Sequence, residues 1–497
     1  MRRTAWPGRR NIDRQPVSKS RYLLGLRCHK LLWLDEHDRD ETPPDAESRF
    51  RMDEGTAVGV RARAFAGEGV LIKSPDFARE QKLDETRRAM ESGAPLIFEA
   101  TFSAAGAIVR TDIIRRMPDG FDLIEVKSST SVKEEQLAEV AMQLFVLRAA
   151  GLTVPRAFVM HLNKDCRFPD LSNLFVTVDV TADVEAMQAE TGKELAAQIA
   201  MLGGPKPDMP FGQYCKRPEP CARFADCWGS LPEHHVHTLY RVQWKSVEKN
   251  LAAGLDTIDK LDETKTTVVP AQRQIRSVRA KKRIVEDTLG AALDTLRAPV
   301  AWLDFETVGL AVPVWPGCAP FTQVPVQFSV HWHTGAKKDH REYLAKAGGD
   351  PRPALAAALV SALDGAQTIV AYYASFEKAC VTQLAEAVPE HRDALEAING
   401  RIVDLLPIVR DNVYDPAFYG SFSLKKVLPA LVPAMSYADL DVREGGTAMA
   451  LLAQLLVDPE QIGGDEAVEK LRRQLLAYCE RDTEAMVRLA EALRAMS

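Results

Sequence analysis

Between residues 96 and 128, hydrophobic and polar positions follow the period of β-strands. Three runs at 96–102, 107–116 and 120–128 are rich in β-branched and aromatic residues, and 118–120 reads Pro-Asp-Gly, a turn signal. Apolar positions recur with helical spacing at 18–35, 55–65 and 133–150. This pattern predicts an α/β unit built on three consecutive strands flanked by helices.

A similar mixture returns in the last 200 residues or so. An apolar strand is predicted at 300–307, a strand leading into a helix at 369–376, and a helix around 475–482. The segment 234–296 is helical and charged in pattern, and Pro270 is expected to break it. For 497 residues we expect several domains: a disordered basic arm (1–17), a first domain (18–230), a helical linker (231–295) and a last domain (296–497).

The composition is that of a globular protein, with 46% hydrophobic and 27% charged residues. No apolar run approaches the roughly 20 residues of a membrane span, and 11–20 is too polar for an export signal after the arginine pairs at 2–3 and 9–10. We expect a soluble, cytoplasmic protein without a membrane partner. A net charge of −6 argues against a uniformly basic DNA-coating protein, so nucleic acid would be bound by a local patch or through metal ions.

The first cluster of chemically active residues is Asp112, Glu125 and Lys127. Strand alternation puts Glu125 and Lys127 on one face, from which both can reach Asp112, expected at the end of the neighbouring strand. Two carboxylates can hold Mg²⁺, and a lysine beside them can orient water or stabilise charge on a phosphate. The plainer alternative is a surface ion pair at a sheet edge.

A second acidic cluster is predicted in the last domain. Asp304 and Glu306 share one face of a strand, where their repulsion and desolvation are costly unless a divalent metal such as Mg²⁺ or Mn²⁺ is bound. Tyr478 and Asp482 are four apart on a helix and project together, and Glu377 offers a third acid. The alternative is that these acids cap helices or pair at the surface.

Four cysteines suggest a metal site in the first domain. Cys215, Cys221 and Cys227 recur at intervals of six, and Cys28 is the candidate fourth ligand. In a cytoplasmic chain four thiolates suit a 4Fe-4S cluster or zinc, and the spacing does not choose between them. The alternative is a set of unrelated thiols, which is how we interpret the other four cysteines: Cys166, Cys318, Cys380 and Cys479.

A basic stripe is predicted between the two domains. Arg276, Arg279 and Arg283 lie at i, i+3 and i+7, so a helix would present them on one side. Three further basic residues reinforce the stripe: Arg273, Lys281 and Lys282. The stripe could follow a phosphate backbone, or it could be an ordinary solvated face.

Taken together, the first group of motifs resembles the PD-(D/E)XK nucleases of the RecB type, in particular the CRISPR-associated adaptation exonuclease and AddB-like iron-sulfur proteins. The resemblance covers most of 18–230 and rests on 110–112 (Arg-Thr-Asp), 125–130 (Glu-Val-Lys-Ser-Ser-Thr), Gln143 and the cysteines. It implies a restriction-endonuclease-like fold, a catalytic lysine at Lys127, and a 4Fe-4S cluster on the four cysteines that staples the domain. It also implies metal ligands at Asp112 and Glu125 and a nucleic-acid contact at Gln143. Thr56 and Leu147 stand where such proteins often have histidine and tyrosine, and Glu99 could add a carboxylate.

The last domain resembles the DnaQ-like exonucleases of the RNase H-like fold, in their DEDDy form. The resemblance rests on the Asp-x-Glu strand, Glu377 after an aromatic residue, the Tyr-x-x-x-Asp helix, and the segments 404–407 and 421–429. It implies two metal ions on Asp304, Glu306 and Asp482, with Tyr478 orienting the attacking water. Tyr373 and Glu377 stand where that family has Asn and Asp, and Asp404, expected to be structural, is an alternative third acid. The whole chain also resembles bacterial RecB-family proteins whose last part is a domain of unknown function.

These features predict a metal-dependent deoxyribonuclease that processes DNA ends, in repair or in defence against foreign DNA. One alternative is a nucleic-acid-binding scaffold in which one or both sites have decayed. Another is an RNA 3′ exonuclease that uses only the last domain. No Gly-x-x-x-x-Gly-Lys-Ser/Thr loop is present, so unwinding would need a helicase or defence-system partner.

Overall fold

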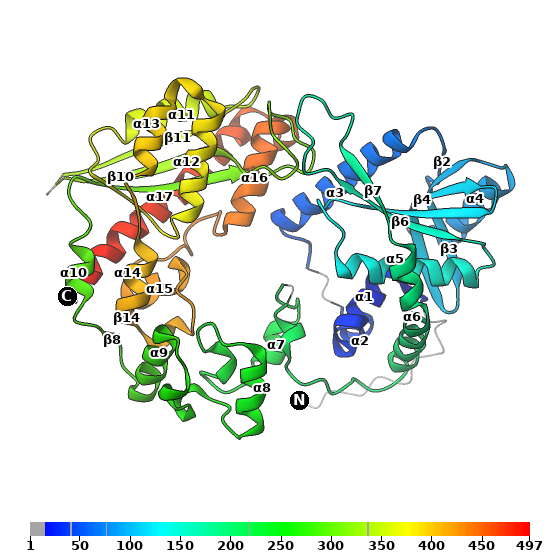
Figure 1. The fold of residues 1–497 in the computed structure, drawn as a ribbon, viewed down its shortest axis with the longest axis horizontal. Helices are drawn as coiled ribbons and strands as arrows, with labels where there is room; N and C mark the ends of the chain where they lie inside the picture. The colour runs from blue at the N-terminus through cyan, green and yellow to red at the C-terminus, as the bar shows by residue number, and fades with distance from the viewer. Residues whose placement is uncertain (1–14, 40–41, 76, 218, 335–336) are drawn as a thin grey trace, which may run out of the picture. The chain divides into compact units, whose positions relative to one another are not determined.

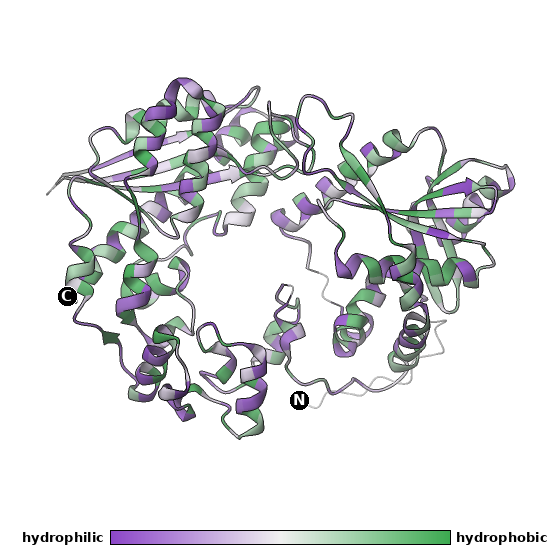
Figure 2. Ribbon diagram, viewed as in Figure 1, coloured by the Kyte–Doolittle hydropathy of each residue, from purple (hydrophilic) through white to green (hydrophobic). Residues whose placement is uncertain are grey.

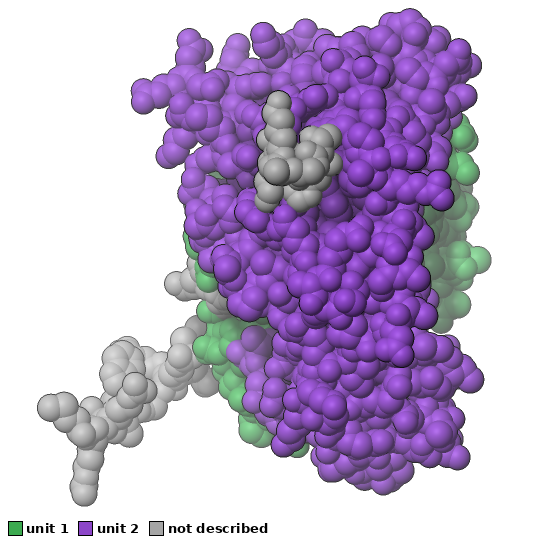
Figure 3. All heavy atoms as spheres, turned by 90° about the vertical axis from the view of Figure 1, so that its left-hand side faces the viewer, with its two compact units in different colours: residues 1–43, 52–166, 170–224 green, residues 44–51, 167–169, 225–497 purple. Residues whose placement is uncertain are grey.

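The computed structural model describes residues 15–39, 42–75, 77–217, 219–334 and 337–497. The protein is a mixed α/β protein, about half helical, with a seven-stranded and a five-stranded sheet (Figure 1). It forms two compact units, coloured separately in Figure 3. Unit 1 comprises the described residues of 1–43, 52–166 and 170–224, and unit 2 those of 44–51, 167–169 and 225–497.

Unit 1 is built on the seven-stranded sheet, in the order β2-β3-β4-β5-β6-β7 with β1 pairing to β4. Strands β3, β4 and β5 form an antiparallel meander, whereas β5 and β6 are parallel and are joined through helix α5 (Glu134–Ala149). The strands are β1 (Val17–Ser18), β2 (Val70–Leu71), β3 (Leu96–Ala104), β4 (Ala107–Met117), β5 (Gly120–Lys127), β6 (Arg156–Leu162) and β7 (Phe175–Asp179). The three predicted strands are confirmed within one or two residues at each end.

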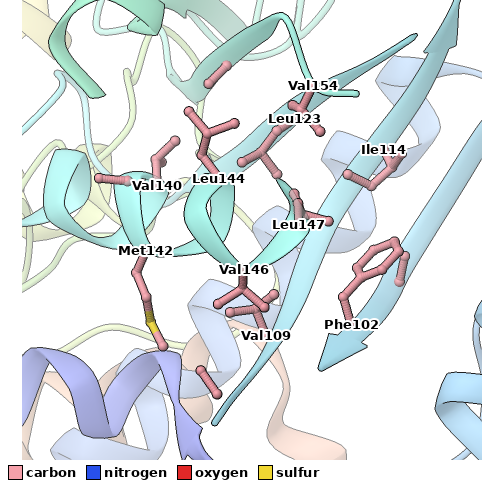
Figure 4. Close-up of a cluster of buried hydrophobic side chains, with 14 of the residues drawn as sticks. Phe102, Val109, Ile114, Leu123, Val140, Met142, Leu144, Val146, Leu147 and Val154 are labelled. Atoms are coloured by element: carbon pink, nitrogen blue, oxygen red, sulfur yellow. The ribbon is translucent and has the colours of Figure 1, made fainter. Parts of the chain in front are cut away.

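The core of unit 1 lies between this sheet and α5. Figure 4 shows Val140, Leu144 and Leu147 of α5 packed beside Leu123 of β5 and Ile114 of β4. All five side chains are 1% exposed or less, so a large apolar area is removed from water. This packing fixes the strands that carry the first acidic cluster.

The helices of unit 1 differ from the predicted ones at their ends. The single helix expected over 18–35 is two helices, α1 (Lys19–Arg27) and α2 (His29–His37), because Cys28 has an extended backbone that ends one and begins the other. Helix α3 (Ala46–Ala66) starts well before residue 55. The remaining long helices are α4 (Arg79–Glu91) and α6 (Thr181–Leu202). The predicted arm lies largely outside the described residues, and Val17 belongs to β1.

The five-stranded sheet of unit 2 has the order β11-β10-β9-β12-β13. Strand β10 is antiparallel to β9 and to β11, while β12 is parallel to β9 and to β13. The strands are β9 (Val300–Val308), β10 (Val324–Thr334), β11 (Lys337–Leu344), β12 (Thr368–Ala371) and β13 (Ile402–Asp404). The predicted Asp-x-Glu strand and the strand at 369 are therefore confirmed as strands.

Helices cover both faces of this sheet. Ala301, Leu303 and Phe305 pack with α11 (Arg352–Ala362) and α12 (Ser375–Ala387). The alternate residues of β9 face the long helix α17 (Asp465–Arg494), against which Trp302 packs. Figure 1 shows α11 and α17 on opposite sides of β10. Helix α17 mixes hydrophobic and hydrophilic residues along its length (Figure 2), whereas α11 is mostly apolar. The second acidic cluster thus lies between the sheet and α17.

The segment between the predicted domains packs into unit 2. Its helices are α8 (Trp244–Ala252), α9 (Val269–Ala280) and α10 (Leu289–Leu293). Pro270 was predicted to break a helix. It lies instead in the first turn of α9, where its missing N–H costs nothing. Helix α9 ends at Ala280 because Lys281 adopts a left-handed conformation, and β8 (Ile284–Val285) then pairs with β14 (Val413–Tyr414).

Five further helices complete unit 2: α7 (Phe224–Trp228, beginning at the unit boundary), α13 (Arg392–Asn399), α14 (Leu405–Asn412), α15 (Leu424–Leu431) and α16 (Gly445–Val457). Among the described residues, six short 3₁₀ turns link the elements of unit 2, and a seventh (Gln213–Cys215) lies in unit 1. Within the described part of the chain, no helix is long and apolar enough to span a membrane.

Candidate metal-dependent catalytic centres

The first centre lies where β4 and β5 run side by side in unit 1. Asp112 lies in the middle of β4, not at its end as predicted, and its Oδ2 accepts a hydrogen bond of 2.7 Å from the Val126 amide. Glu125 and Lys127 project from β5 on the same face, with Lys127 Nζ 2.8 Å from Glu125 Oε1. The three predicted residues therefore come together.

Glu125 is held by donors on both of its oxygens. Lys19 Nζ from the start of α1 lies 2.7 Å from Oε1, and Gln143 Nε2 from α5 donates to Oε2 at 2.7 Å. Both lysines also contact Glu139, at 2.8 Å for Lys19 and 2.6 Å for Lys127. Gln143, predicted to contact nucleic acid, is fully buried and positions Glu125 instead.

The charges in this centre are strongly coupled. Burial raises the pKa of Asp112 to about 7, and the neighbouring Glu125 adds to the rise. Burial acts in the same direction on Glu125, but Lys19 and Lys127 outweigh it and hold the pKa of Glu125 well below its ordinary value. Burial favours neutral lysines, yet the surrounding carboxylates raise the pKa of both. Lys127 is therefore a cation suited to stabilising negative charge rather than a base.

Glu99 sits beside Asp112 in a strained conformation. Its φ of 60° lies in the left-handed region, and the β3–β4 pairing skips it between Phe98↔Ile113 and Ala100↔Thr111. The distortion turns its carboxylate toward Arg63 (3.0 Å) and Arg110 (3.1 Å). Glu99, considered as an extra metal ligand, is thus already paired with two arginines.

A cavity of about 890 Å³ opens beside this centre. Asp112 and Lys127 lie in its wall, together with the two arginines that bind Glu99. Lys73 and Lys82 add positive charge, and hydroxyl groups come from Thr56, Ser74 and Ser128. A cavity with this mixture of basic and hydroxyl groups suits an anionic, phosphate-bearing ligand next to the acids.

The second centre lies in unit 2, between β9 and α17. Asp304 and Glu306 project from β9, Asp482 comes from α17, and Glu377 lies in the first turn of α12. Asp304, Glu306 and the Cys479 thiol each offer one ligand atom, and these atoms lie within 4.8 Å of one another. Asp304 and Glu306 therefore lie together, and Asp482 and Glu377 are near enough to raise the pKa of Asp304. The thiol of Cys479, considered a spare thiol, lies 3.6 Å from Asp304 Oδ2.

The acids of the second centre repel one another in a desolvated place. Burial raises the pKa of Asp304 well above its ordinary value, with Asp482, Glu306 and Glu377 adding to the rise. Burial and Asp482 act likewise on the pKa of Glu306. Burial also raises the pKa of Glu377 to about 8, and its buried Oε2 has no hydrogen-bond partner. Oxygen ligands with uncompensated charge and an orphaned oxygen fit a hard divalent cation such as Mg²⁺.

Two tyrosines and a lysine complete this centre. Tyr437 Oη donates a 2.5 Å hydrogen bond to Asp482 Oδ1, and Tyr478 is 3% exposed beside the same carboxylate. Burial, with Asp482 next, raises the pKa of both tyrosines, so both keep their protons. Lys425 Nζ lies 5.5 Å from the Tyr437 ring and 5.4 Å from the Tyr478 ring. Asp404 has a structural role, because one of its oxygens accepts from the amides of Tyr373 and Leu406, both at 2.9 Å.

Three of the four cysteines predicted to form a metal site belong to unit 1: Cys28, Cys215 and Cys221. The Gly212 amide donates to Cys215 Sγ at 3.5 Å, and Arg27, next to Cys28, donates to the Tyr214 carbonyl at 2.9 Å. Cys227 lies on α7, in the part of the chain assigned to unit 2.

The predicted basic stripe is interrupted. Arg283 lies beyond the end of α9, because the left-handed Lys281 ends that helix, and it pairs with Asp415 at 3.0 Å. Arg279 donates to the carbonyls of Asp259 and Leu261, while Arg276 pairs with Glu286 at 3.1 Å. Arg273 and Lys282 do not extend the stripe either. Arg273 is buried, with 2% of its surface exposed, and Lys282 lies beyond the end of α9.

This chain is similar to a protein family and to a relative whose descriptions state no function. Residues 301–423 match the family described as "Domain of unknown function (DUF2779)", a stretch that holds Asp304, Glu306 and Glu377 but ends before α17. A relative from Mycoplasma pneumoniae (strain ATCC 29342 / M129 / Subtype 1), "Uncharacterized protein MG366 homolog", is 28% identical over 254 residues. That match covers 45% of this chain and 37% of the relative. A solved structure titled "Crystal structure of SSO0001" is 15% identical over 40% of this chain and 92% of that chain, with a TM-score of 0.16.

Proposed function

We propose that the protein is a metal-dependent nuclease that hydrolyses phosphodiester bonds of DNA, with one centre in each unit. The observation that carries the proposal is the convergence of Asp304, Glu306, Glu377 and Asp482 in a desolvated place, where burial raises their pKa values. Without a cation such an arrangement costs stability and brings no structural gain. Binding sites accept costs of this kind when the ligand offsets them.

The strand order of unit 2 supports an RNase H-like exonuclease of the DnaQ type. In the order β11-β10-β9-β12-β13 only β10 runs antiparallel to the other four strands, which is the arrangement expected for that fold. The closing helix α17 brings Tyr478 and Asp482 onto the face of β9 that carries the acids. The match to a family of unknown function neither names nor excludes this activity.

In unit 2 the carboxylates would hold two Mg²⁺ or Mn²⁺ ions, which supply an activated water and stabilise the leaving 3′ oxygen. Tyr437 fixes Asp482 through its hydrogen bond, so this ligand is preorganised. Tyr478 keeps its proton and therefore acts as a donor that orients water, not as a base. Lys425, which pairs with Glu444 at 2.8 Å, adds a positive charge beside the Tyr478 ring.

In unit 1 the meander β3-β4-β5 followed by α5 and a parallel β6 supports a restriction-endonuclease-like nuclease of the RecB type. Asp112 and Glu125 would hold the metal ion, and Lys127 stays charged to stabilise the phosphate. The basic cavity beside them gives room for the substrate strand. The 4Fe-4S cluster on the cysteines remains a prediction, with zinc as its alternative.

A scaffold with a decayed first centre is the second candidate, and one observation favours it. Glu125 already receives Lys19, Lys127 and Gln143 on its two oxygens, so a metal ion must compete with two built-in cations. In that case only unit 2 would be active, on DNA or on RNA 3′ ends. Repair or defence, cytoplasmic location and a helicase partner stay predictions.

The test compares wild type with Glu125→Gln and Asp304→Asn on end-labelled DNA and RNA, with Mg²⁺ or Mn²⁺. Exposed acids nearby in sequence provide matched controls, Glu134→Gln and Asp294→Asn. Loss of a ligand should lower the corresponding activity more than about 100-fold, since even residues that support a ligand contribute 10- to 100-fold. Two separate losses support two centres, and loss in Asp304→Asn alone supports the scaffold for unit 1. A wild type inactive on every substrate refutes the proposal for the isolated chain.

A further inference from the structure

A second group of metal-ligating side chains lies in unit 2, formed by His331, His340 and Glu480. His331 on β10 and His340 on β11 are direct cross-strand partners, and their rings lie 4.5 Å apart between centroids. Glu480 comes from α17, with its Oε1 3.6 Å from His340 Nδ1. One ligand atom from each of the three lies within 4.8 Å of the others.

Each histidine is oriented by a hydroxyl group behind it. His331 Nδ1 is 2.8 Å from Thr483 Oγ1, and His340 Nε2 is 2.9 Å from Ser329 Oγ. The two hydroxyls are themselves 2.7 Å apart, and both residues are fully buried. Metal-binding histidines commonly use one ring nitrogen for a supporting hydrogen bond and the other for the metal. Here His331 Nδ1 and His340 Nε2 make the supporting bonds, and His340 Nδ1 faces Glu480.

The site is open to solvent on one side. A pocket of about 140 Å³ reaches both histidines and is also lined by Asp339 and Glu484. The side chain of His340 is 22% exposed and that of Glu480 is 48% exposed, so an ion can enter without unfolding. Asp339 pairs with Arg341 at 3.2 Å, and Glu484 pairs at 3.5 Å with Arg488, which also lines the pocket. Water from the pocket is therefore the expected fourth ligand.

We propose that His331, His340 and Glu480 bind a transition-metal ion, with Zn²⁺ the ion of choice. Two imidazoles and one carboxylate are the ligands that Zn²⁺ and its neighbours prefer, whereas Mg²⁺ prefers oxygen alone. The bound ion ties β10 and β11 to α17, the helix that carries Tyr478 and Asp482. This site uses different ligands from the two proposed nuclease centres and does not depend on their activity.

The test measures zinc binding to the full chain after metal removal, by calorimetric titration and by metal analysis. Wild type should bind one more Zn²⁺ per chain than His340→Ala or Glu480→Gln, and Thr483→Val should bind it about 10- to 100-fold more weakly. His391→Ala, which lies on a separate turn of unit 2, is the control and should bind as wild type does. Thermal unfolding of each variant without metal checks that it folds.

Cobalt supplies an independent measurement. Co²⁺ should give wild type a visible absorption band that Glu480→Gln weakens and that survives in Asp304→Asn and in Cys221→Ser. Zn²⁺ should also raise the unfolding temperature of wild type but not that of His340→Ala. Equal zinc stoichiometry and affinity in wild type, His340→Ala and Glu480→Gln would overturn the proposal, as would loss of the cobalt band in Asp304→Asn.

Discussion

Replacing Glu377 with glutamine should stabilise the metal-free protein. The side chain is 3% exposed, and its Oε2 lacks a hydrogen-bond partner. Burial raises the pKa of Glu377 from 4.5 to about 8, with Asp404 adding to the rise. The folded protein therefore takes up a proton that the unfolded chain has lost at neutral pH, and this uptake costs free energy. Glutamine has nearly the same shape as the protonated acid and avoids that cost.

The magnitude follows from linkage. Below pH 4.5 the carboxyl is protonated in both states, so wild type and Glu377→Gln should be about equally stable. As pH rises toward about 8, the wild type loses stability at 1.36 kcal/mol per pH unit. The variant should therefore be more stable by about 3 kcal/mol at pH 7 and by about 4 kcal/mol at pH 8. For a unit of this size, 3 kcal/mol corresponds to a rise in Tm on the order of 5 to 10 °C.

The assay is calorimetric unfolding in a chelator at pH 4.5, 7 and 8. Glu386→Gln on the exposed side of the same helix is the matched control, with a change expected within about 0.5 kcal/mol at every pH. Added Mg²⁺ should stabilise wild type more than Glu377→Gln, since the variant has lost an oxygen charge. If Glu377→Gln were no more stable than wild type at pH 8, the desolvated acid would not carry the cost assigned to it.

Three further predictions concern unit 1. Burial, with Glu125, raises the pKa of Asp112 to about 7, so protons should compete with Mg²⁺ for this carboxylate below that pH. In an Asp304→Asn background, the Mg²⁺ affinity measured by titration should therefore fall about tenfold per pH unit below 7. A pH-independent affinity would contradict this. Lys19→Met should lower the free energy of unfolding at pH 7 by about 1 to 3 kcal/mol in denaturant titration, since Lys127 still faces Glu125; the exposed Lys193→Met should change little. Cys221→Ser should remove brown colour and iron, whereas a colourless, zinc-loaded wild type would exclude the iron-sulfur prediction.

Local patterns were enough to predict the strands that carry the chemistry. The alternation around Glu125 and Lys127, and around Asp304 and Glu306, places each pair on one strand face, and a strand period survives any change of tertiary context. Tyr478 and Asp482 were paired by the helical spacing of four. These predictions held because each depends only on neighbours in sequence.

The partners that come from afar were missed, because no local pattern signals them. Lys19 is 106 residues from Glu125, and Tyr437 is 45 residues from Asp482. The break at Cys28 was missed because apolar spacing continues on both sides of it. The basic stripe was predicted wrongly because the left-handed conformation of Lys281 ends α9, and the spacing of basic residues carries no signal for that end.

The two centres handle the same electrostatic problem in opposite ways. In unit 1 two lysines lie within 2.8 Å of the central carboxylate, so its charge is neutralised from within the protein. In unit 2 Lys425 lowers the pKa of Glu306 and Asp482 only in part, and burial still keeps both raised. In the first centre a metal ion would therefore compete with the two lysines for Glu125. In the second centre a metal ion would balance the negative charge of the buried acids. On this reasoning the acids of unit 2 have the greater need of a divalent cation, whereas a metal ion in unit 1 would have to displace Lys19 and Lys127 from Glu125.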